Sequence, residues 1–197
     1  MSTNNKAPYV DIHTHIECGD RVTVSCVGTH PWSAKSGVEL AVVTSETEAI
    51  GEIGLDFCCD ISPQIQEELF NREVDRAIEL NLPIILHAVR SLDKIIAIIK
   101  QKSPRAVIVH GFIGSKELMK TALNQGFYIS FGESALRSPK TIEALKIIPR
   151  DRLFFESDMS QTPIEQIYSK LCCVMGESVD EIRESIYSNY LEIFKEF

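Results

Sequence analysis

Five histidines stand where a metal-binding enzyme would need them. Each lies at or shortly after the end of a short apolar run of the kind that forms a β-strand: His13, His15, His30, His87 and His110. Two carboxylates, Glu52 and Asp158, occupy equivalent places on or after two further apolar runs. In a parallel β/α barrel the carboxyl ends of the strands converge on one mouth, so residues far apart in the sequence would meet there.

The first pair of histidines has the spacing of metal ligands. His13 and His15 are two positions apart on an expected strand, so their side chains share one face with Asp11. A single buried histidine is more often a hydrogen-bonded core residue, but five imidazoles and two carboxylates would be costly to bury unless cations satisfied them. Their mixture suits Zn²⁺, Mn²⁺, Ni²⁺ or Fe²⁺ better than Ca²⁺. Asp11 is placed to accept a hydrogen bond from a ligand imidazole.

The number of candidate ligands indicates two ions. Three protein ligands suffice for a single catalytic zinc, and six are present besides His30. A carboxylate such as Glu52 can bridge two ions about 3.5–4 Å apart, and such a pair activates a shared water for displacement at phosphorus. The same centre could hydrolyse an amide or an ester, and composition and spacing do not choose between these reactions.

Composition bounds the class of protein. The chain has 197 residues, 44% hydrophobic and 24% charged, which is typical of one globular domain over residues 1–197. No apolar run approaches the roughly 20 residues that span a bilayer, and MSTNNKAPYV lacks the apolar stretch of a signal peptide. We therefore expect no membrane partner and a cytoplasmic location. The net charge of −8 argues against bulk attraction to nucleic acid but permits a local phosphate site built on metal ions.

The cysteines form neither a zinc ribbon nor a redox motif. No C-x-x-C spacing occurs among Cys18, Cys26, Cys58, Cys59, Cys172 and Cys173. We expect reduced thiols that pack as small hydrophobic side chains.

Apolar runs alternate with helical patterns, which predicts β/α units around a parallel sheet. The expected strands are 9–15, 22–28, 48–53, 83–87, 106–110, 127–131 and 152–156. The sequence therefore predicts an α/β fold with seven strands.

Local signals mark the helices between the strands. Ser62 followed by Pro63 predicts an N-cap with proline in the first helical position. A further helix is expected between the serine and the glycine that bound residues 115–126. Ser178 and Glu181 have the spacing of a capping box, in which each side chain caps the other's backbone N–H, before a last helix.

Several sequence strings occur in the order of a known family: VDIHTHI, GTHPW, AIGEIGLDF, QEELFNREVDRAIELNLPIILHAVR, VIVHGF and DRLFFESD. With the tail SNYLEIF, the matches extend from Tyr9 to Phe197. GEIGLD and L-P-x-x-x-H are specific enough that chance is a poor explanation for them. The chain resembles the TatD-related metal-dependent deoxyribonucleases of the amidohydrolase superfamily, as a short variant. The resemblance implies an α/β, TIM-barrel-like metal-dependent hydrolase fold, here distorted and with seven strands.

The resemblance also implies a ligand set for two divalent ions, Zn, Mn, Mg or Ni. The implied ligands are His13, His15, Glu52, His87, His110 and Asp158. The two histidines of the string HTH would bind the first ion with Asp158, the two later histidines would bind the second, and Glu52 would bridge both. Asp158 would also help to deprotonate the attacking water, so Glu52 and Asp158 are the implied catalytic carboxylates.

The resemblance implies substrate contacts as well. His30, from GTHP, resembles a family residue near the substrate phosphate, and its alternative is a loop or N-cap partner beside the following proline. Arg90 is the candidate substrate-binding arginine, although it stands three residues after His87 where the family usually has it two after. Asp56 would orient the loop that follows Glu52.

Besides the position of Arg90, the chain departs from the family in two places. Only 14 residues separate His15 from His30, so a βα step is missing and the barrel is expected to be distorted or open, which a second subunit could cover in a homo-oligomer. After Asp158 the chain reads MSQTPIEQIY, without the family's proline-containing run or its Arg-Asn-x-Pro segment. Glu133 and Arg137 follow a strand and could substitute in substrate binding, or form a solvated loop pair.

These observations predict a divalent-metal-dependent hydrolase of phosphodiesters. DNA ends or short single-stranded DNA are the expected substrates, because an acidic surface and a shortened groove disfavour a long duplex. A small phosphoester, ester or amide is the alternative substrate. A non-catalytic metal-holding or partner-binding protein is a third possibility, although binding alone would not need every ligand.

Overall fold

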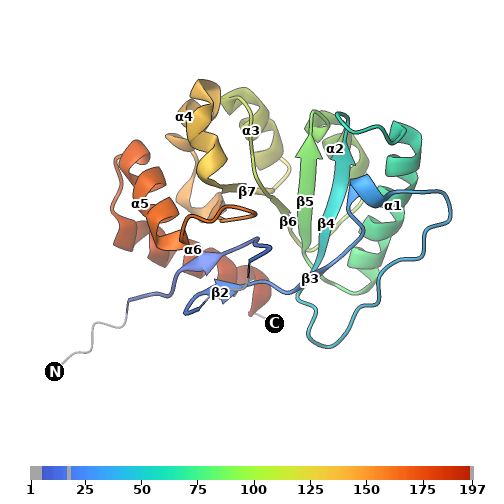
Figure 1. Ribbon diagram of the computed structural model, residues 1–197, viewed down its shortest axis with the longest axis horizontal. Coiled ribbons are helices and arrows are strands. Elements are labelled where there is room, and N and C mark those ends of the chain that lie inside the picture. The colour runs from blue at the N-terminus through green and yellow to red at the C-terminus, as the bar shows by residue number, and fades with distance from the viewer. Residues whose placement is uncertain (1–5, 17–18, 196–197) are drawn as a thin grey trace. The chain divides into compact units, whose positions relative to one another are not determined.

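The computed structural model describes residues 6–16 and 19–195 of the chain (Figure 1). The described residues fall into two compact units. Unit 1 takes its residues from Met1–Thr23, Gly111–Glu117 and Ile129–Phe197, and unit 2 takes its residues from Val24–His110 and Leu118–Tyr128. The single domain expected over residues 1–197 stays a prediction, and Cys18 lies outside the described residues.

Unit 2 is built on parallel strands, each paired with the next. They are β3 (Cys26–Val27), β4 (Ala49–Asp56), β5 (Ile84–Val89) and β6 (Val107–Val109). Ile50 pairs with Ile84 and Ile53 with Leu86, so the register shifts between these two pairs. All four side chains are fully buried, as expected for strands of a parallel sheet that is covered on both faces.

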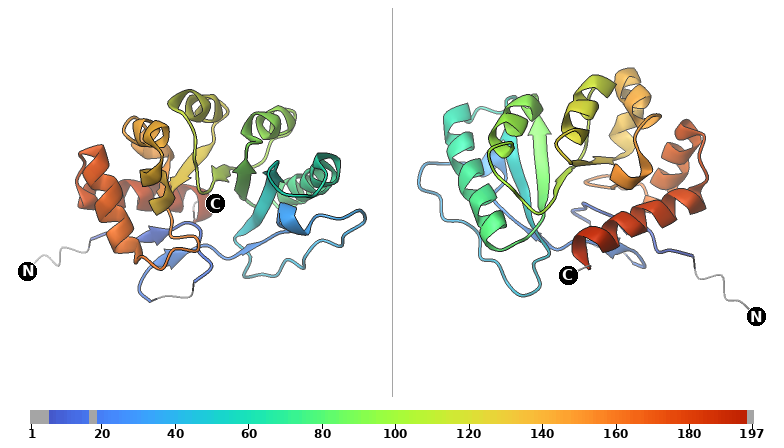
Figure 2. Two further views of the ribbon diagram at one scale, coloured as in Figure 1. Left: turned by 45° about the horizontal axis from the view of Figure 1, so that its top comes forward. Right: turned by 180° about the vertical axis from the view of Figure 1, so that it is seen from behind.

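Two helices cover this sheet, α1 (Pro63–Glu79) and α2 (Leu92–Ile99), and α1 runs along β4 (Figure 2). The hydroxyl of Ser62 accepts the N–H of Ile65 at 3.4 Å, and Pro63 takes the first helical position, where no N–H is needed. The predicted start of α1 is therefore confirmed. A short 3₁₀ helix, η1 (Pro31–Ser33), follows β3.

Unit 1 contains two parallel strand pairs. They are β1 (Val10–Asp11) with β2 (Val22–Thr23), and β7 (Tyr128–Phe131) with β8 (Leu153–Phe155). The N–H of Ile12 donates to the carbonyl of Phe155 at 3.1 Å, which joins the end of β1 to β8. The chain segment around His13 is thereby fixed beside the segment that leads to Asp158.

The helices of unit 1 pack against these strands. They are α4 (Pro139–Leu145), α5 (Ile164–Met175) and α6 (Val179–Phe194), with the short 3₁₀ helices η2 (Glu133–Arg137) and η3 (Arg150–Arg152). The fully buried Tyr168 of α5 donates to the carbonyl of Val10 at 2.8 Å, and Asn189 of α6 donates to that of Leu153 at 3.0 Å. α3 (Lys116–Leu123) begins in unit 1 and ends in unit 2, and Gly126 beyond it has the expected left-handed φ of +80°.

The single strand predicted over 22–28 is wrong. The structure has β2 and β3 there, so the described residues contain eight strands rather than seven. The N–H of Val22 donates to the carbonyl of Tyr9 at 2.8 Å, whereas the carbonyl of Ser25 accepts the backbone N–H of Glu48 at 2.8 Å. The segment breaks because its two halves serve different partners, β1 and β4.

The capping box predicted at Ser178 is also wrong. Ser178 is the N-cap residue of α6, but its side chain makes no capping hydrogen bond. The carboxylate of Glu181, which the box would use, instead accepts from Arg150 at 3.0 Å. An ion pair with η3 therefore replaces the local cap.

The expectation that the cysteines pack as small hydrophobic side chains holds only in part. Cys172 is buried in α5, and burial raises the pKa of its thiol to about 12. Cys58 and Cys173 are exposed.

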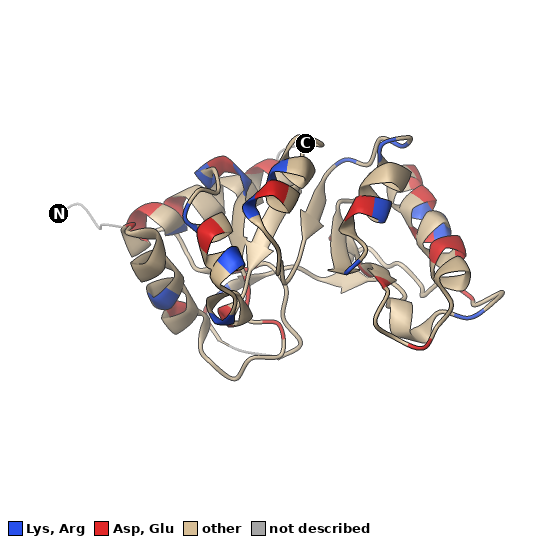
Figure 3. Cartoon of the chain, turned by 90° about the horizontal axis from the view of Figure 1, so that it is seen from above, with Lys and Arg blue, Asp and Glu red and all other residues tan. Residues whose placement is uncertain are grey.

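Charged residues of both signs occur along the helices (Figure 3). In unit 2, for example, Lys94 of α2 pairs with Glu67 of α1 at 2.9 Å. Within the described parts of the chain, no helix combines the length and the apolar character that crossing a membrane requires.

Candidate metal centre

Three predicted ligands come together in unit 1: His13, His15 and Asp158. The Nε2 atoms of the two histidines are 3.2 Å apart and lie 3.8 and 3.6 Å from Oδ1 of Asp158. His13 is buried, whereas half of the His15 side chain is exposed. One donor atom from each residue lies within 4.8 Å of the others, so two imidazoles and a carboxylate could hold one divalent cation.

The backbone holds these three residues in place. Asp158 donates its N–H to the carbonyl of His13 at 3.0 Å, and His15 donates to that of Asp158 at 3.1 Å, so Thr14 and Asp158 form a parallel bridge. Asp158 has a φ of +51°, in the left-handed region that aspartate tolerates better than most residues. The segment after β8 therefore leaves strand geometry at the ligand itself.

The role expected for Asp11 is corrected by the structure. Its carboxylate is engaged by Ser157 and Arg21 rather than by an imidazole: the backbone N–H and hydroxyl of Ser157 donate at 2.8 and 2.7 Å, and Arg21 lies at 3.1 Å. Burial raises the pKa of Asp11, while the hydrogen bonds from Ser157 and the charge of Arg21 act to lower it. Asp11 thus fixes the residue before Asp158 and positions the cluster through the backbone.

A second cluster forms in unit 2 around one carboxylate oxygen. Oε2 of Glu52 lies 2.7 Å from Nε2 of His110 and 3.4 Å from Nδ1 of His87, and these two nitrogens are 3.2 Å apart. Glu52 lies on β4, His87 on β5, and His110 directly follows β6. Because these strands are parallel and adjacent, residues distant in sequence share one edge of the sheet. This is the convergence that the sequence predicts.

A glycine lets β4 and β5 approach closely beside this cluster. Gly54 has a φ of +153°, and a Cβ added there would lie 1.8 Å from the carbonyl oxygen of His87. Only glycine fits this position. The peptide bond between Gly51 and Glu52 is cis.

His30 joins the same cluster from η1. Its Nε2 lies 3.8 Å from Oε2 of Glu52, and its ring centroid is 4.4 Å from that of His87. Its Nδ1 accepts the N–H of Trp32 at 3.2 Å, so the proton of a neutral ring is on Nε2. Burial, with the charge of His87, lowers the pKa of His30 to about 4, which keeps the ring neutral near pH 7. His30 is therefore both the N-cap of η1 and a hydrogen-bond donor toward the cluster.

Asp56 ties the cluster to its surroundings more extensively than the sequence predicts. Its Oδ2 accepts the indole N–H of Trp32 at 2.7 Å and lies 3.5 Å from Nε2 of His87, while Oδ1 accepts the N–H of Cys58 at 2.8 Å. Burial acts to raise the pKa of Asp56, but the hydrogen bonds from Trp32 and Cys58 together with the nearby His87 outweigh it and lower the pKa. Asp56 thus fixes the orientation of His87 as well as the loop after β4.

Two buried polar residues of α1 support the cluster and are absent from the sequence prediction. The fully buried Gln66 accepts the N–H of Asp56 at 2.7 Å and donates to its carbonyl at 2.9 Å. The fully buried Glu73 accepts the N–H of Thr29 at 2.9 Å and pairs with Arg76 at 2.5 Å. For both Gln66 and Glu73, the sequence signal that could have revealed this role is a polar residue on the apolar face of a predicted helix.

The expected substrate residues of unit 1 line a hollow beside Asp158. It has a volume of about 290 Å³, and Glu133 and Arg137 are among its lining residues. Glu133 accepts hydrogen bonds from Thr162 at 2.8 Å and from Ser160 at 3.2 Å, and it pairs with Lys170. The contacts with Lys170 and Thr162 outweigh partial burial and lower the pKa of Glu133. Through its hydrogen bonds to Ser160 and Thr162, Glu133 also holds the loop after Asp158.

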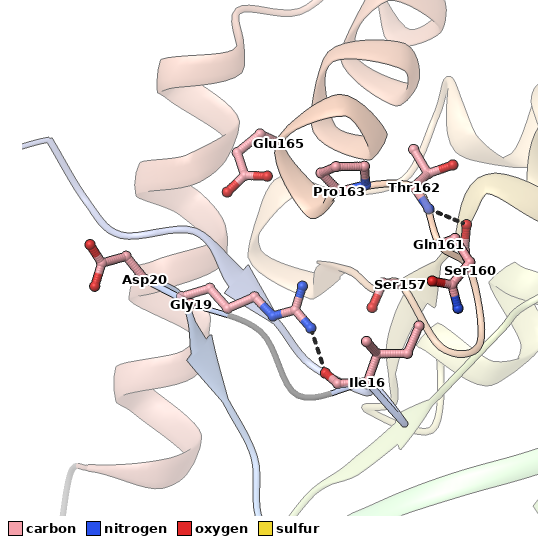
Figure 4. A pocket seen from close by; sticks show the side chains of 10 residues that line it. Ile16, Gly19, Asp20, Ser157, Ser160, Gln161, Thr162, Pro163 and Glu165 are labelled. Carbon is pink, nitrogen blue, oxygen red and sulfur yellow. Dashed lines mark hydrogen bonds between the residues drawn. The ribbon is translucent and has the colours of Figure 1, made fainter.

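A second hollow of unit 1, of about 160 Å³, also has Ser157 in its lining (Figure 4). Arg21, one of its lining residues, donates to the carbonyl of Ile16 at 3.0 Å while also holding Asp11. In unit 2, Arg90 is exposed directly after β5, with a φ of +51°. The role of Arg90 in substrate binding stays a prediction.

Comparison with known proteins adds independent observations. The family model described as TatD related DNase matches residues 7–195 of the chain. The metal-dependent hydrolase YabD of Bacillus subtilis, itself described as uncharacterized, is 41% identical over 115 residues, which are 56% of this chain and 45% of YabD. The 3'-5' ssDNA/RNA exonuclease TatD of Erwinia tasmaniensis is 32% identical over 147 residues, 68% of this chain and 57% of that protein. The chain thus spans about half the length of these relatives.

A solved structure agrees with the sequence comparisons. The crystal structure of YJJV, a TatD homologue from Escherichia coli K12, superposes with a TM-score of 0.69 at 27% identity, covering 78% of this chain and 66% of that one. This likeness confirms the α/β, TIM-barrel-like fold class that the sequence predicts.

Proposed function

Because the chain belongs to the TatD related DNase family, we propose that it is a divalent-metal-dependent hydrolase of phosphodiester bonds. The two ligand clusters carry this proposal: His13, His15 and Asp158 in unit 1, and Glu52, His87 and His110 in unit 2. Each brings neutral imidazoles and a carboxylate within reach of one cation, the donor set that hydrolytic Zn²⁺ and Mn²⁺ sites use.

We propose one divalent ion for each cluster. When bound, such ions polarise the phosphoryl oxygen and lower the pKa of water, so that hydroxide is available near neutral pH. In each cluster the imidazoles would bind the ion through an unprotonated ring nitrogen, and the carboxylate would supply a negative charge opposite it. The bridging role expected for Glu52 and the identity of the native metal stay predictions.

The protein's own residues would then position the phosphate for attack by water. His30, through its Nε2–H, donates to a phosphate oxygen and so stabilises the charge that develops there. Water attacks phosphorus and releases its proton to solvent, and the bond from phosphorus to the leaving oxygen breaks. The role of Asp158 in deprotonating the attacking water stays a prediction. The leaving oxygen takes a proton from solvent.

We further propose a single-stranded nucleic acid as the substrate, either DNA ends or short strands. One relative is named a 3'-5' ssDNA/RNA exonuclease, which makes RNA a second substrate to test. The net charge of −8 favours short strands, because long duplexes rely on extended basic surfaces for affinity. The homo-oligomer and the cytoplasmic location stay predictions.

The proposal is tested by metal add-back. Metal-stripped protein is supplied with Mg²⁺, Mn²⁺, Zn²⁺ or Ni²⁺ and incubated with an end-labelled single-stranded DNA and with the RNA of the same sequence. The Glu52→Gln variant, which keeps the side-chain volume, is run beside it. We expect cleavage by the wild type only. Equal cleavage by Glu52→Gln would reveal a contaminating nuclease, and no cleavage with any metal would overturn the nucleic acid as substrate.

A small diester run in parallel separates the alternatives. Turnover of the small diester without cleavage of the oligonucleotides would identify a hydrolase of small phosphoesters. Metal binding without turnover of either would identify a metal-holding protein.

A further inference from the structure

Trp32 is a large aromatic side chain that the fold leaves exposed and yet holds firmly. Of its surface, 62% is accessible to solvent. Its indole N–H donates to Oδ2 of Asp56 at 2.7 Å, and its backbone N–H donates to Nδ1 of His30 at 3.2 Å. Exposed indoles normally gain stability by burial. Here both N–H groups of the residue instead donate hydrogen bonds that hold the ring at the surface.

The backbone around Trp32 is also restrained. Trp32 follows the buried Pro31, whose φ is fixed by its ring, within η1. Ser33 donates its N–H to the carbonyl of His30 at 2.9 Å, and Ala34 donates to that of Pro31 at 3.1 Å, which closes the turn. Because Trp32 is already ordered, a ligand that stacks on the indole would cause little further loss of conformational entropy in this side chain.

The indole lies beside the ligand cluster of unit 2. Its centroid is 4.6 Å from the ring of His30 and 6.1 Å from that of His87, and both contacts are edge-to-face. His30 is the residue whose Nε2–H is directed to the cluster, where the proposed function requires the phosphate. An aromatic surface is therefore adjacent to the phosphate position, as a nucleobase is adjacent to its own phosphate within a nucleotide.

We propose that Trp32 stacks on a nucleobase of the strand being cleaved, and so makes the enzyme prefer nucleotides over other phosphodiesters. The inference rests on the proposed function, because that function places the phosphate at the cluster. Every base has a planar face, so a stacking residue binds single strands without reading their sequence. Trp32 is a substrate-binding residue and takes no part in proton transfer.

The first test uses the fluorescence of Trp32, which is the single tryptophan of the chain. Metal-loaded protein is titrated with deoxyadenosine 5′-monophosphate, a product-like nucleotide without a diester bond. Deoxyribose 5-phosphate, which has the same phosphate and no base, is the matched probe. We expect saturable quenching by the nucleotide only. Equal responses to both probes, or no response to either, would overturn the proposal.

The second test compares Trp32→Phe with Trp32→Leu. Both variants lose the indole N–H to Asp56, so they differ in whether position 32 is aromatic. Each is assayed on an oligonucleotide and on the same oligonucleotide with an abasic terminal residue. We expect the ratio of the two kcat/KM values to fall about tenfold in Trp32→Leu, through KM, and to stay close to that of the wild type in Trp32→Phe.

The outcomes keep this inference distinct from the proposed function. An unchanged ratio in Trp32→Leu, with hydrolysis intact, would overturn the stacking role alone. Absence of hydrolysis in the wild type would overturn the proposed function, and the nucleotide titration would still decide whether Trp32 binds a base.

Discussion

His30 and His87 have the same side chain and lie against one another, but their hydrogen bonds give them different roles. The N–H of Trp32 occupies Nδ1 of His30, which leaves the proton on Nε2 and makes that atom a donor. Asp56 lies 3.5 Å from Nε2 of His87, which leaves Nδ1 to face Glu52 at 3.4 Å. A protonated nitrogen cannot bind a cation, so His87 is suited to be a ligand and His30 to contact the substrate.

This difference predicts opposite effects of matched substitutions. His30→Asn retains an oxygen that can accept the N–H of Trp32, so we expect it to keep its metal content while kcat on a labelled oligonucleotide falls roughly 10²–10³-fold. His87→Asn should instead lose metal. Atomic emission spectroscopy of the purified variants measures the metal, and equal metal loss in both variants would contradict the assignment.

Asp56 is expected to act on the metal through His87. Asp56→Asn removes the charge that orients His87, so we expect the affinity for Mn²⁺ or Zn²⁺ to fall roughly 10–100-fold. Calorimetric titration of metal-stripped protein measures the affinity. Asp60→Asn, four positions later and exposed, is the control and should bind metal as the wild type does; an unchanged affinity in Asp56→Asn would refute the role of this carboxylate.

At the scale of elements, the pairing of β4 with β5 depends on one missing side chain. Gly54 pairs with His87, and no room exists for a Cβ beside the carbonyl of His87. The two strands carry Glu52 and His87, so the distance between these ligands depends on the same approach. The close approach of β4 and β5 at Gly54 therefore constrains both the pairing of the strands and the spacing of Glu52 and His87.

Gly54→Ala should therefore be among the most destabilising small substitutions. The added methyl group must separate β4 from β5, so we expect the free energy of unfolding to fall by at least about 3 kcal/mol. Gly126→Ala is the matched control, because Gly126 also has a positive φ but no atoms near its missing Cβ, and about 1–2 kcal/mol is expected there. Denaturant unfolding compares the variants, and similar losses would show that backbone conformation rather than close approach decides.

The sequence predicts well those helices and strands that are long enough to show a pattern of apolar residues or a capping signal. α1 has a cap, a proline and an apolar stripe, and β4 a continuous apolar run, so the sequence reveals both. β2 and β3 are two residues each and show no periodicity, which is why the sequence predicts one strand over 22–28. The capping box failed because an ion pair from η3 took Glu181, and local spacing does not record such a competitor.

The clustering of the candidate metal ligands within each unit could be predicted for a different reason. They combine a rare residue type with a repeated position at strand ends, and parallel topology then brings them together. The network from Trp32 through Asp56 to Gln66 could not be predicted, because its members are 24 and 10 residues apart and no periodicity relates them. Such contacts follow from the folded arrangement alone.

At the scale of the whole molecule, the ligands divide between the two units. His13, His15 and Asp158 belong to unit 1, while Glu52, His87 and His110 belong to unit 2. Each unit therefore brings together its own imidazoles and its own carboxylate.

This division predicts separable metal binding. The double variant His13→Asn, His15→Asn should retain about one ion per chain where the wild type binds two, because the cluster around Glu52 is intact. Metal analysis after dialysis measures the ratio of ion to protein. Loss of both ions would mean that the clusters bind metal as one centre.

Unit 1 is assembled from three separate stretches of the chain, whereas unit 2 is complete at Tyr128. During synthesis, the stretch with His13 and His15 leaves the ribosome long before Asp158 does. Ile12 finds its backbone acceptor only when Phe155 has emerged. Nascent chains generally fold in the order in which they are made. The growing chain would thus complete the cluster around Glu52 first, and the ion of unit 1 would be selected only when translation has passed residue 158.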